Sequence, residues 1–224
     1  MWPLPVLDDQ SRYCLGVLAM PDTSSESAVC GVRSAAKDYG LPEEILSDHG
    51  SAFGTSKRSV SAFTAYVWAL GVEHIQGRCA HPQTQGKLER FNQTLQKECI
   101  SRHSYSTLED WNKSFEEYRH IYNEVRPHES LGDNPPATCY NPSSKAFSEP
   151  DRLSHEEGEG LLHRKVDVSG RIWLLQHRVD VGGGLAGWVV SARHEGDGVW
   201  TLLFRGRSIC QATLSKLAPY KPRP

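Results

Sequence analysis

With 224 residues, 38% of them hydrophobic and six of them tryptophan, the chain is long enough for one large domain or two smaller ones with packed cores. Its net charge of −2 does not by itself suggest a polyanion-binding protein, and no apolar stretch approaches the roughly 20 residues of a membrane-crossing helix, so we expect no membrane partner. The six cysteines are scattered without a CxxC pair, which argues against a disulfide framework or a zinc knuckle and makes a reducing cytoplasm the expected location.

Residues 1–133 alternate short apolar segments with segments of helical periodicity. We predict strands over 4–20 (two, joined by a polar "DDQSR" turn), 43–48 and 72–76, and helices over 24–40, 58–70, 84–101 and 107–124. Serines suited to N-capping open the first helix, and Gly40 ends it. Strands that alternate with helices predict an α/β layer architecture. The last helix carries four aromatic side chains at helical spacing, which predicts core positions for Trp111, Phe115, Tyr118 and Tyr122.

The composition and hydrophobic pattern of the sequence change after residue 133. Residues 134–160 are rich in proline, serine and acids and predict a linker that wraps or spans. Residues 161–218 contain short, partly alternating apolar segments separated by "SG", "GGG", "EGDG" and "RGR" turns, which predict a small all-β barrel.

Charge is distributed unevenly between the two parts of the chain. Residues 1–160 hold 15 Lys and Arg against 23 Asp and Glu, a balance of −8, whereas residues 161–224 hold 10 against 4, a balance of +6. This asymmetry indicates a basic module that meets a polyanion. Chance surface composition is the alternative.

Two acids stand out by their predicted positions. Asp48 follows a strand, at the end where open α/β sheets place their ligands. Glu89 lies on the helix over 84–101, on the flank of an apolar stripe formed by Leu88, Phe91, Leu95 and Cys99. Mg²⁺ prefers oxygen ligands and is commonly held by one or two carboxylates together with phosphate. The pair is therefore a candidate metal site for phosphoryl transfer, although a strand-end Asp and a helical Glu are more often structural.

Three segments of the sequence favour the metal site over a purely structural role for these two acids. "LPEEILSDHGSAFG", "LGVEHIQGRCAHPQTQGKLERFNQTLQKE" and "YRHIYNEVRPHESLGDNPPATCYNPS" closely resemble the integrase-like insertion-sequence transposases of the retroviral integrase superfamily. The resemblance covers about residues 4–145, with the segments in the expected order and spacing. The β segments that follow resemble, less specifically, the C-terminal barrel that many of these transposases carry.

The resemblance implies an RNase H-like (integrase catalytic core) fold followed by a small SH3-like barrel. It implies DNA cleavage and strand transfer by three acids, Asp, Asp and Glu, that hold two Mg²⁺ or Mn²⁺ ions. Asp48 matches the second Asp and Glu89 matches the Glu, while Gln85 and Gly86 match the loop that approaches the DNA end. By charge and helix position, the expected DNA contacts are Lys87, Arg90, Gln93 and Lys97.

The sequence departs from the family pattern at the first Asp. The resemblance places that residue on a strand ahead of the "VLDDQSRY" hairpin, so we expect an α/β core that lacks its first strand. Asp8 and Asp9 do not fill the vacancy, because both fall in the hairpin turn, where Asp bonds its own backbone and Arg12 is held. We expect the chain alone to show little or no strand-transfer activity.

DNA (transposon ends and target) is the expected partner, with a homo-oligomer or a mixed oligomer with full-length transposase, in a bacterial-type cytoplasm at the nucleoid. The rival interpretation is a catalytically silent DNA-binding remnant, which the +6 balance favours. A metal-dependent nuclease that hydrolyses without joining is a third.

Several other residues have structural explanations that we prefer. His74, Cys79 and His81 lie close in sequence, but their spacing fits no usual zinc site. Arg126 and His128 of "NEVRPHESL" are expected to pack and cap a helix end. The last three tryptophans are expected mainly in the barrel core, with one of them exposed as the minority alternative: Trp173, Trp188 and Trp200.

Overall fold

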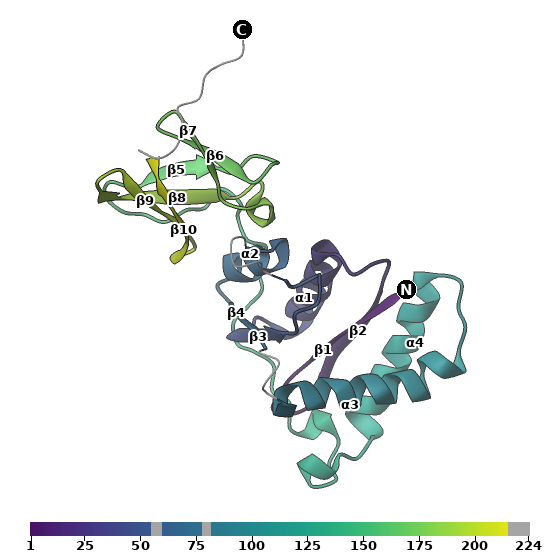
Figure 1. Cartoon of the computed structure of the whole chain (residues 1–224). Coiled ribbons are helices and arrows are strands. Elements are labelled where there is room, and N and C mark those ends of the chain that lie inside the picture. Colours follow the sequence, from purple (N-terminus) through teal and green to yellow (C-terminus); the bar gives the residue numbers. More distant parts are fainter. Residues whose placement is uncertain (55–59, 78–81, 215–224) are drawn as a thin grey trace. The chain divides into compact units, whose positions relative to one another are not determined.

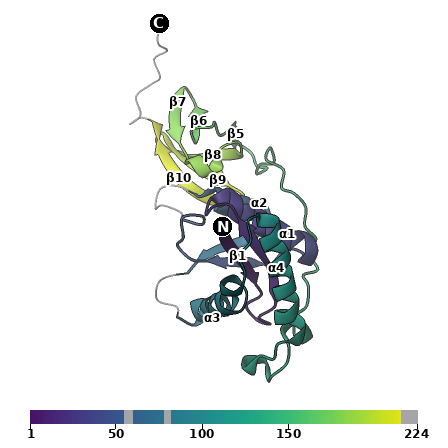
Figure 2. The same cartoon turned by 90° about the vertical axis from the view of Figure 1, so that its right-hand side faces the viewer.

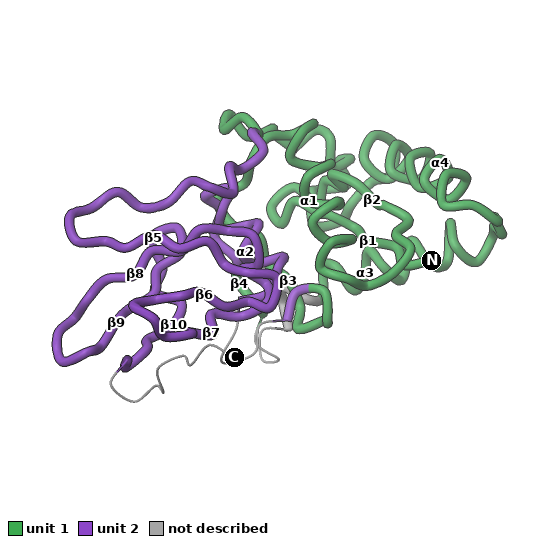
Figure 3. Tube along the Cα trace, turned by 90° about the horizontal axis from the view of Figure 1, so that it is seen from above, with its two compact units in different colours: residues 1–52, 75–147 green, residues 53–74, 148–224 purple. Residues whose placement is uncertain are grey.

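The structure is a computed structural model that describes residues 1–54, 60–77 and 82–214, without the side chains of residues 82–85 (Figure 1). It divides into two compact units, each described here by itself (Figure 3). Unit 1 comprises Met1–Ala52 and Ile75–Phe147, and unit 2 comprises Phe53–His74 and Ser148–Pro224. Among the described helices, none has the length and apolar character needed to cross a membrane.

Unit 1 begins with the predicted hairpin. Strands β1 (Trp2–Leu7) and β2 (Cys14–Met20) pair antiparallel, with Leu4 opposite Leu18. In the turn, Asp8 Oδ2 accepts hydrogen bonds from Ser11 N at 2.7 Å and Ser11 Oγ at 2.6 Å, and the Arg12 guanidinium donates to the Asp9 carbonyl. The turn role predicted for the two aspartates is therefore what the structure shows.

Helix α1 (Ser25–Tyr39) follows with both predicted ends. The Ser24 side chain accepts from Ser27 N at 3.2 Å, satisfying a donor at the helix start. Gly40 closes the helix at φ +81°, where a Cβ atom would lie 2.7 Å from the Ser143 carbonyl oxygen. Only glycine fits this end of the helix, for both conformation and space.

Two further strands of the described chain form a second small sheet. Strand β3 (Glu44–Ser47) pairs with β4 (Glu73–Gln76), and Gly77 N donates to the Ser47 carbonyl at 2.9 Å. The described strands of the α/β part thus form two two-stranded sheets, β1–β2 and β3–β4. The mixed α/β architecture is as predicted, and assignment to the RNase H-like fold stays a prediction.

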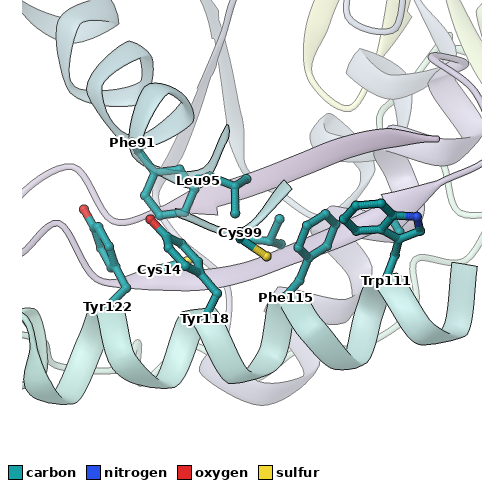
Figure 4. Packing of buried hydrophobic residues seen from close by; sticks show 10 residues of the cluster. Cys14, Phe91, Leu95, Cys99, Trp111, Phe115, Tyr118 and Tyr122 are labelled. Carbon is teal, nitrogen blue, oxygen red and sulfur yellow. The ribbon is translucent and has the colours of Figure 1, made fainter. Parts of the chain in front are cut away.

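The core of unit 1 lies between the hairpin and two helices, α3 (Pro82–Glu98) and α4 (Leu108–His120) (Figure 4). Phe91, Leu95 and Cys99 from the α3 side meet the α4 side of the core. The aromatic stripe predicted for this core is buried as expected: Trp111, Phe115, Tyr118 and Tyr122. Leu88 was also predicted in the apolar stripe of this helix, but it is 37% exposed and so is not part of the buried core.

A π-helical turn, Ile121–Val125, extends α4 and carries a buried polar clamp. Asn123 Oδ1 accepts from Cys14 N at 2.8 Å, and Asn123 Nδ2 donates to the Cys14 carbonyl at 2.9 Å. Beyond the turn, Arg126 pairs with Glu98 at 2.7 Å, and the His128 ring packs edge-on against Tyr122. The packing role predicted for Arg126 and His128 is confirmed.

Unit 2 contains a separate antiparallel β module (Figure 2). Its four-stranded sheet has the order β10-β9-β8-β5, and β6 and β7 form a two-stranded hairpin. The strands are β5 (Leu162–Lys165), β6 (Arg171–Leu174), β7 (His177–Asp180), β8 (Val189–Gly196), β9 (Val199–Phe204) and β10 (Arg207–Thr213). The β segments are as predicted, whereas closure into an SH3-like barrel stays a prediction.

Helix α2 (Ala62–Ala69) groups with this β module. It begins later than the predicted residue 58, because the Ser61 side chain caps it by accepting from Thr64 N at 3.0 Å; residues 55–59 lie outside the described chain. Gly184 approaches the backbone before α2 so closely that a Cβ atom would lie 2.2 Å from the Val60 carbonyl oxygen. Arg207 also pairs with Glu73 and stacks over Trp68.

The predicted linker is divided between the two units. Residues 134–147 belong to unit 1, where Leu41 N donates to the Lys145 carbonyl at 2.7 Å. Residues 148–160 run along the β module, where Glu156 accepts from Ser191 Oγ and from Gly206 N. The boundaries predicted from sequence (1–133, 134–160 and 161–218) stay a prediction beside this division by contacts.

Candidate functional site

Asp48 lies where the sequence places it, directly after β3. Asp48 is exposed, and its Oδ1 accepts a hydrogen bond from Gly50 N at 2.7 Å. Ser47 Oγ donates to the Asp48 carbonyl at 3.1 Å. The bond from Gly50 N orients the Asp48 carboxylate, and the bond from Ser47 Oγ holds the backbone at the start of the loop. The group is thus both accessible and held by its own loop.

Glu89 lies on α3 and is also exposed. The helix is anchored two residues later by Phe91, which is 1% exposed, and again by Leu95. Because these two side chains turn toward the core, Glu89 is carried on the flank that faces solvent. A well-packed helix thus holds a solvent-facing carboxylate in a fixed position.

Both carboxylates belong to unit 1, but the convergence of Asp48 and Glu89 on one ion stays a prediction. Among the described residues, no group of three or more His, Cys, Asp or Glu side chains is placed to hold a metal ion. Asp8 is occupied by Ser11, as its turn position predicted.

Lys87, predicted as a DNA contact, has a partner within the protein. Its Nζ lies 2.7 Å from Asp9 Oδ2 and donates to the Asp9 carbonyl at 3.2 Å. The side chains are 29% and 66% exposed, so water and salt screen the pair strongly. This bond ties the start of α3 to the β1–β2 turn. Sequence reasoning missed it, because the two residues are far apart along the chain.

The other predicted DNA contacts lie on the outer side of α3. Arg90, Gln93 and Lys97 are all exposed. Gly86 has no described heavy atom within 4 Å of where its Cβ would be, so packing does not require glycine there. The side chain of Gln85 lies outside the described part of the structure, although its backbone belongs to α3. The exposed side chains leave this surface accessible to a large ligand.

His74 of unit 2 has the structural role that we preferred. Its Nδ1 lies 2.8 Å from Thr64 Oγ1, and its ring packs edge-on against Phe63. Burial lowers the pKa of His74 to about 4, which keeps the ring neutral near pH 7. Cys79 and His81 lie outside the described residues.

Comparison with known proteins agrees with the sequence motifs. Residues 70–136, which include Glu89, match the family described as "Integrase core domain". An insertion element IS476 uncharacterized 39.2 kDa protein from Xanthomonas euvesicatoria is 31% identical over 60% of this chain and 37% of that protein. Over these residues the chain is thus similar to integrase-like proteins of insertion sequences. The resemblance on which the sequence analysis relied is confirmed.

Two more similar proteins are an insertion-element protein and a putative integrase. An insertion element IS407 uncharacterized 31.7 kDa protein from Burkholderia multivorans is 27% identical over 57% of this chain and 44% of that protein. A putative integrase ORF3 of Spiroplasma virus SpV1-C74 is 26% identical over 60% of this chain and 40% of that protein. The integrase-like chain thus spans less than half the length of each of these three relatives.

Solved structures similar to this integrase-like chain include two retroviral proteins. The catalytic core domain of BIV integrase has a TM-score of 0.48 and 18% identity, over 61% of this chain and 82% of that one. A chain of a simian T-cell lymphotropic virus intasome, in complex with a PP2A regulatory subunit, has a TM-score of 0.48 and 15% identity, over 92% and 72%.

Proposed function

We propose that this protein acts in DNA integration or transposition by metal-dependent phosphoryl transfer, within an RNase H-like core. The observation that carries the proposal is the integrase core match over residues 70–136, which includes Glu89. An exposed Asp48 at the end of β3 supports it, because the same family pattern requires an acid there.

The donor chemistry of this pair suits Mg²⁺ or Mn²⁺. Asp48 and Glu89 offer only oxygen ligands and are both exposed, so an ion can reach them from solvent. Mg²⁺ commonly keeps several water ligands beside one or two carboxylates and a phosphate. Water and a DNA phosphate would therefore complete its coordination here. When bound, the metal would stabilise the attacking and leaving oxygens of an in-line displacement.

The residues of the chain would contribute binding and orientation. Asp48 would present the carboxylate oxygen that Gly50 leaves free, and Glu89 would present its own from the rigid surface of α3. Arg90 and Lys97 would neutralise DNA phosphates beside the cut, with Gln93 as a neutral hydrogen-bonding neighbour. Lys87 would join them by exchanging its exposed Asp9 partner for a phosphate, at small cost.

We propose that the chain by itself is a weak catalyst. The family pattern calls for a third acid, and neither nearby aspartate is available for that role. Asp8 accepts two hydrogen bonds from Ser11, and Asp9 lies in the same β1–β2 turn rather than on a strand, where the family pattern has its first Asp. Two carboxylates would hold the metal less tightly than three.

A strand-transfer assay with a matching DNA end and Mg²⁺ or Mn²⁺ tests the activity. We expect at most weak product, abolished by Asp48→Asn or Glu89→Gln and unchanged by Glu117→Gln, an exposed acid on α4. Product that survives both site substitutions would refute the assignment of these two acids. Robust turnover that depends on both would instead contradict the weak-catalyst proposal.

A silent DNA-binding protein is the second candidate, and the balance of +6 over residues 161–224 favours it. In this case the chain would modulate a full-length transposase at the bacterial nucleoid, through a mixed oligomer. Salt-dependent DNA binding without any metal-dependent product, together with co-purification with a full-length transposase, would support this candidate.

A further inference from the structure

The strap of unit 2, which we define as residues 148–160, is strongly acidic. It carries five acids and one basic residue, a balance of −4, whereas residues 161–224 have a balance of +6. Most of its residues are exposed, and Glu156 is the acid of the strap that is partly buried. Opposite charges favour the contact between strap and module, and the same basic surface would attract a polyanion such as DNA.

The strap is held against the β module mainly by polar contacts. Arg205 Nη2 donates to the Asp151 carbonyl at 2.6 Å. The Arg152 guanidinium lies 5.0 Å from the ring centroid of Trp188, which is buried as predicted. The leucine of the strap, Leu153, is 58% exposed. Because each polar contact has a small net value in water, the strap can leave the module without opening the apolar core.

Glu156 places its carboxylate among groups that bind anions. Its Oε1 accepts a hydrogen bond from Gly206 N at 2.9 Å, and its Oε2 accepts one from Ser191 Oγ. Burial alone would raise the pKa of Glu156, but the bonds from Ser191 and Gly206, together with the nearby Arg205 charge, hold the pKa below its usual value. The position therefore favours a negatively charged group.

The groups that hold this carboxylate belong to the module rather than to the strap. Ser191 lies on β8 and is 0% exposed, and its Oγ lies 3.0 Å from His163 Nδ1 of β5. Because the Ser191 hydroxyl donates to Glu156, its oxygen accepts from the His163 ring. Arg205 and Gly206 connect β9 to β10, and Arg205 Nε is buried without a hydrogen-bond partner in the described structure. One donor of this arginine is thus left unused while the strap is in place.

We propose that Gly206 N, Ser191 Oγ and the Arg205 guanidinium form a site for a DNA backbone phosphate, which Glu156 fills in the absence of DNA. Backbone N–H groups, serine hydroxyls and arginine side chains are the groups with which proteins contact DNA phosphates. A Cβ atom built on Gly206 would meet no described heavy atom within 4 Å, so there is room beside its backbone. The strap is then a removable cover that lowers the affinity of the module for DNA. The proposal rests on the proposed function, because it takes DNA as the ligand.

The test is fluorescence-anisotropy binding of the full chain to a labelled DNA duplex, without divalent ions. Glu156→Gln should raise the affinity roughly 10-fold, because the uncharged side chain competes poorly with phosphate. Glu157→Gln is the matched control, because it removes the same charge from the next residue of the strap, which is exposed. It should raise the affinity less than about twofold. Equal increases in the two variants, or no increase in Glu156→Gln, would overturn the proposal.

Substitutions of the module residues show whether the opened site contacts DNA. In the Glu156→Gln background, Ser191→Ala should lower the affinity about threefold, because a phosphate contact is then lost. In the same background, Arg205→Gln should lower the slope of log affinity against log salt by about 0.9. Unchanged affinity and slope in these double variants would contradict the site. Unchanged thermal unfolding of the variants ensures that these results report binding.

A measurement on the unsubstituted chain does not depend on how well the variants fold. When duplex DNA is added, the NMR signal of the Gly206 amide should shift more than that of Gly198, in the turn between β8 and β9, because its acceptor changes. An unchanged Gly206 signal with DNA bound would overturn the proposal. An equal shift with inorganic phosphate at the same phosphate concentration would assign a free anion as the ligand and overturn it as well.

These results are separable from those on the proposed function. Because the binding assays contain no divalent ion, absence of strand transfer would refute the proposed function and leave the phosphate site standing. DNA binding that is the same in every variant would refute the phosphate site alone.

Discussion

Replacing Asn123 by alanine should open the N-terminal hairpin of unit 1. Asn123 is 1% exposed, Cys14 is 0% exposed, and the amide holds both backbone groups of Cys14. The substitution leaves a buried N–H and a buried C=O without these partners. Each costs about 1–3 kcal/mol, so we expect about 3 kcal/mol in total. That corresponds to a local opening equilibrium roughly 150-fold larger.

Thiol alkylation measured by mass spectrometry reports this opening directly. Burial raises the pKa of the Cys14 thiol to about 12, so the native thiol is unreactive and labelling requires opening. We expect Cys14 labelling in Asn123→Ala to be faster by about two orders of magnitude. Asn92→Ala, at an exposed position of α3, should leave the rate unchanged. A change below about threefold in Asn123→Ala would refute the clamp as a source of stability.

Three further predictions concern stability. Burial lowers the pKa of His74 to about 4, so between about pH 6.5 and 4 the unfolded chain binds a proton that the folded chain does not. Stability should therefore fall as the pH decreases over this range, and His74→Gln should make the fall less steep in urea titrations. Gly184→Ala should cost about 1–3 kcal/mol in the same titrations, because its Cβ would clash with the backbone before α2, whereas Gly183→Ala, with open space, should cost far less. A double-mutant cycle between Lys87 and Asp9 should give a coupling below about 1 kcal/mol that fades with added salt, because the pair is exposed; a larger, salt-independent value would contradict the screening argument.

The sequence predicted the local structure well wherever short-range chemistry decides it. The caps at Ser24 and Gly40 and the turn at Asp8 and Asp9 follow from hydrogen bonds between residues close in sequence. The positions of Asp48 after β3 and Glu89 on α3 follow equally from local patterns. Family motifs then supplied the functional interpretation that two isolated acids could not.

Contacts between residues far apart along the chain could not be predicted from the sequence. The Asn123 clamp joins residues 109 positions apart, and a single asparagine in an amphipathic segment gives no sign of its partner. The grouping of α2 with the β module depends on how closely Gly184 approaches it, which a glycine in a "GGG" run does not reveal. Leu88 was predicted to be buried with the apolar stripe of its helix, but it is exposed. Helical spacing predicts which side chains share a face, but not how far along the helix the rest of the core covers that face.

Binding of Mn²⁺ in the presence of a DNA end, followed by electron paramagnetic resonance, tests the shared metal site most directly. Asp48→Asn and Glu89→Gln should each weaken binding, and the double variant should bind little worse than either single variant, because both acids would hold the same ion. Independent, fully additive losses, or unchanged binding in either single variant, would contradict the account.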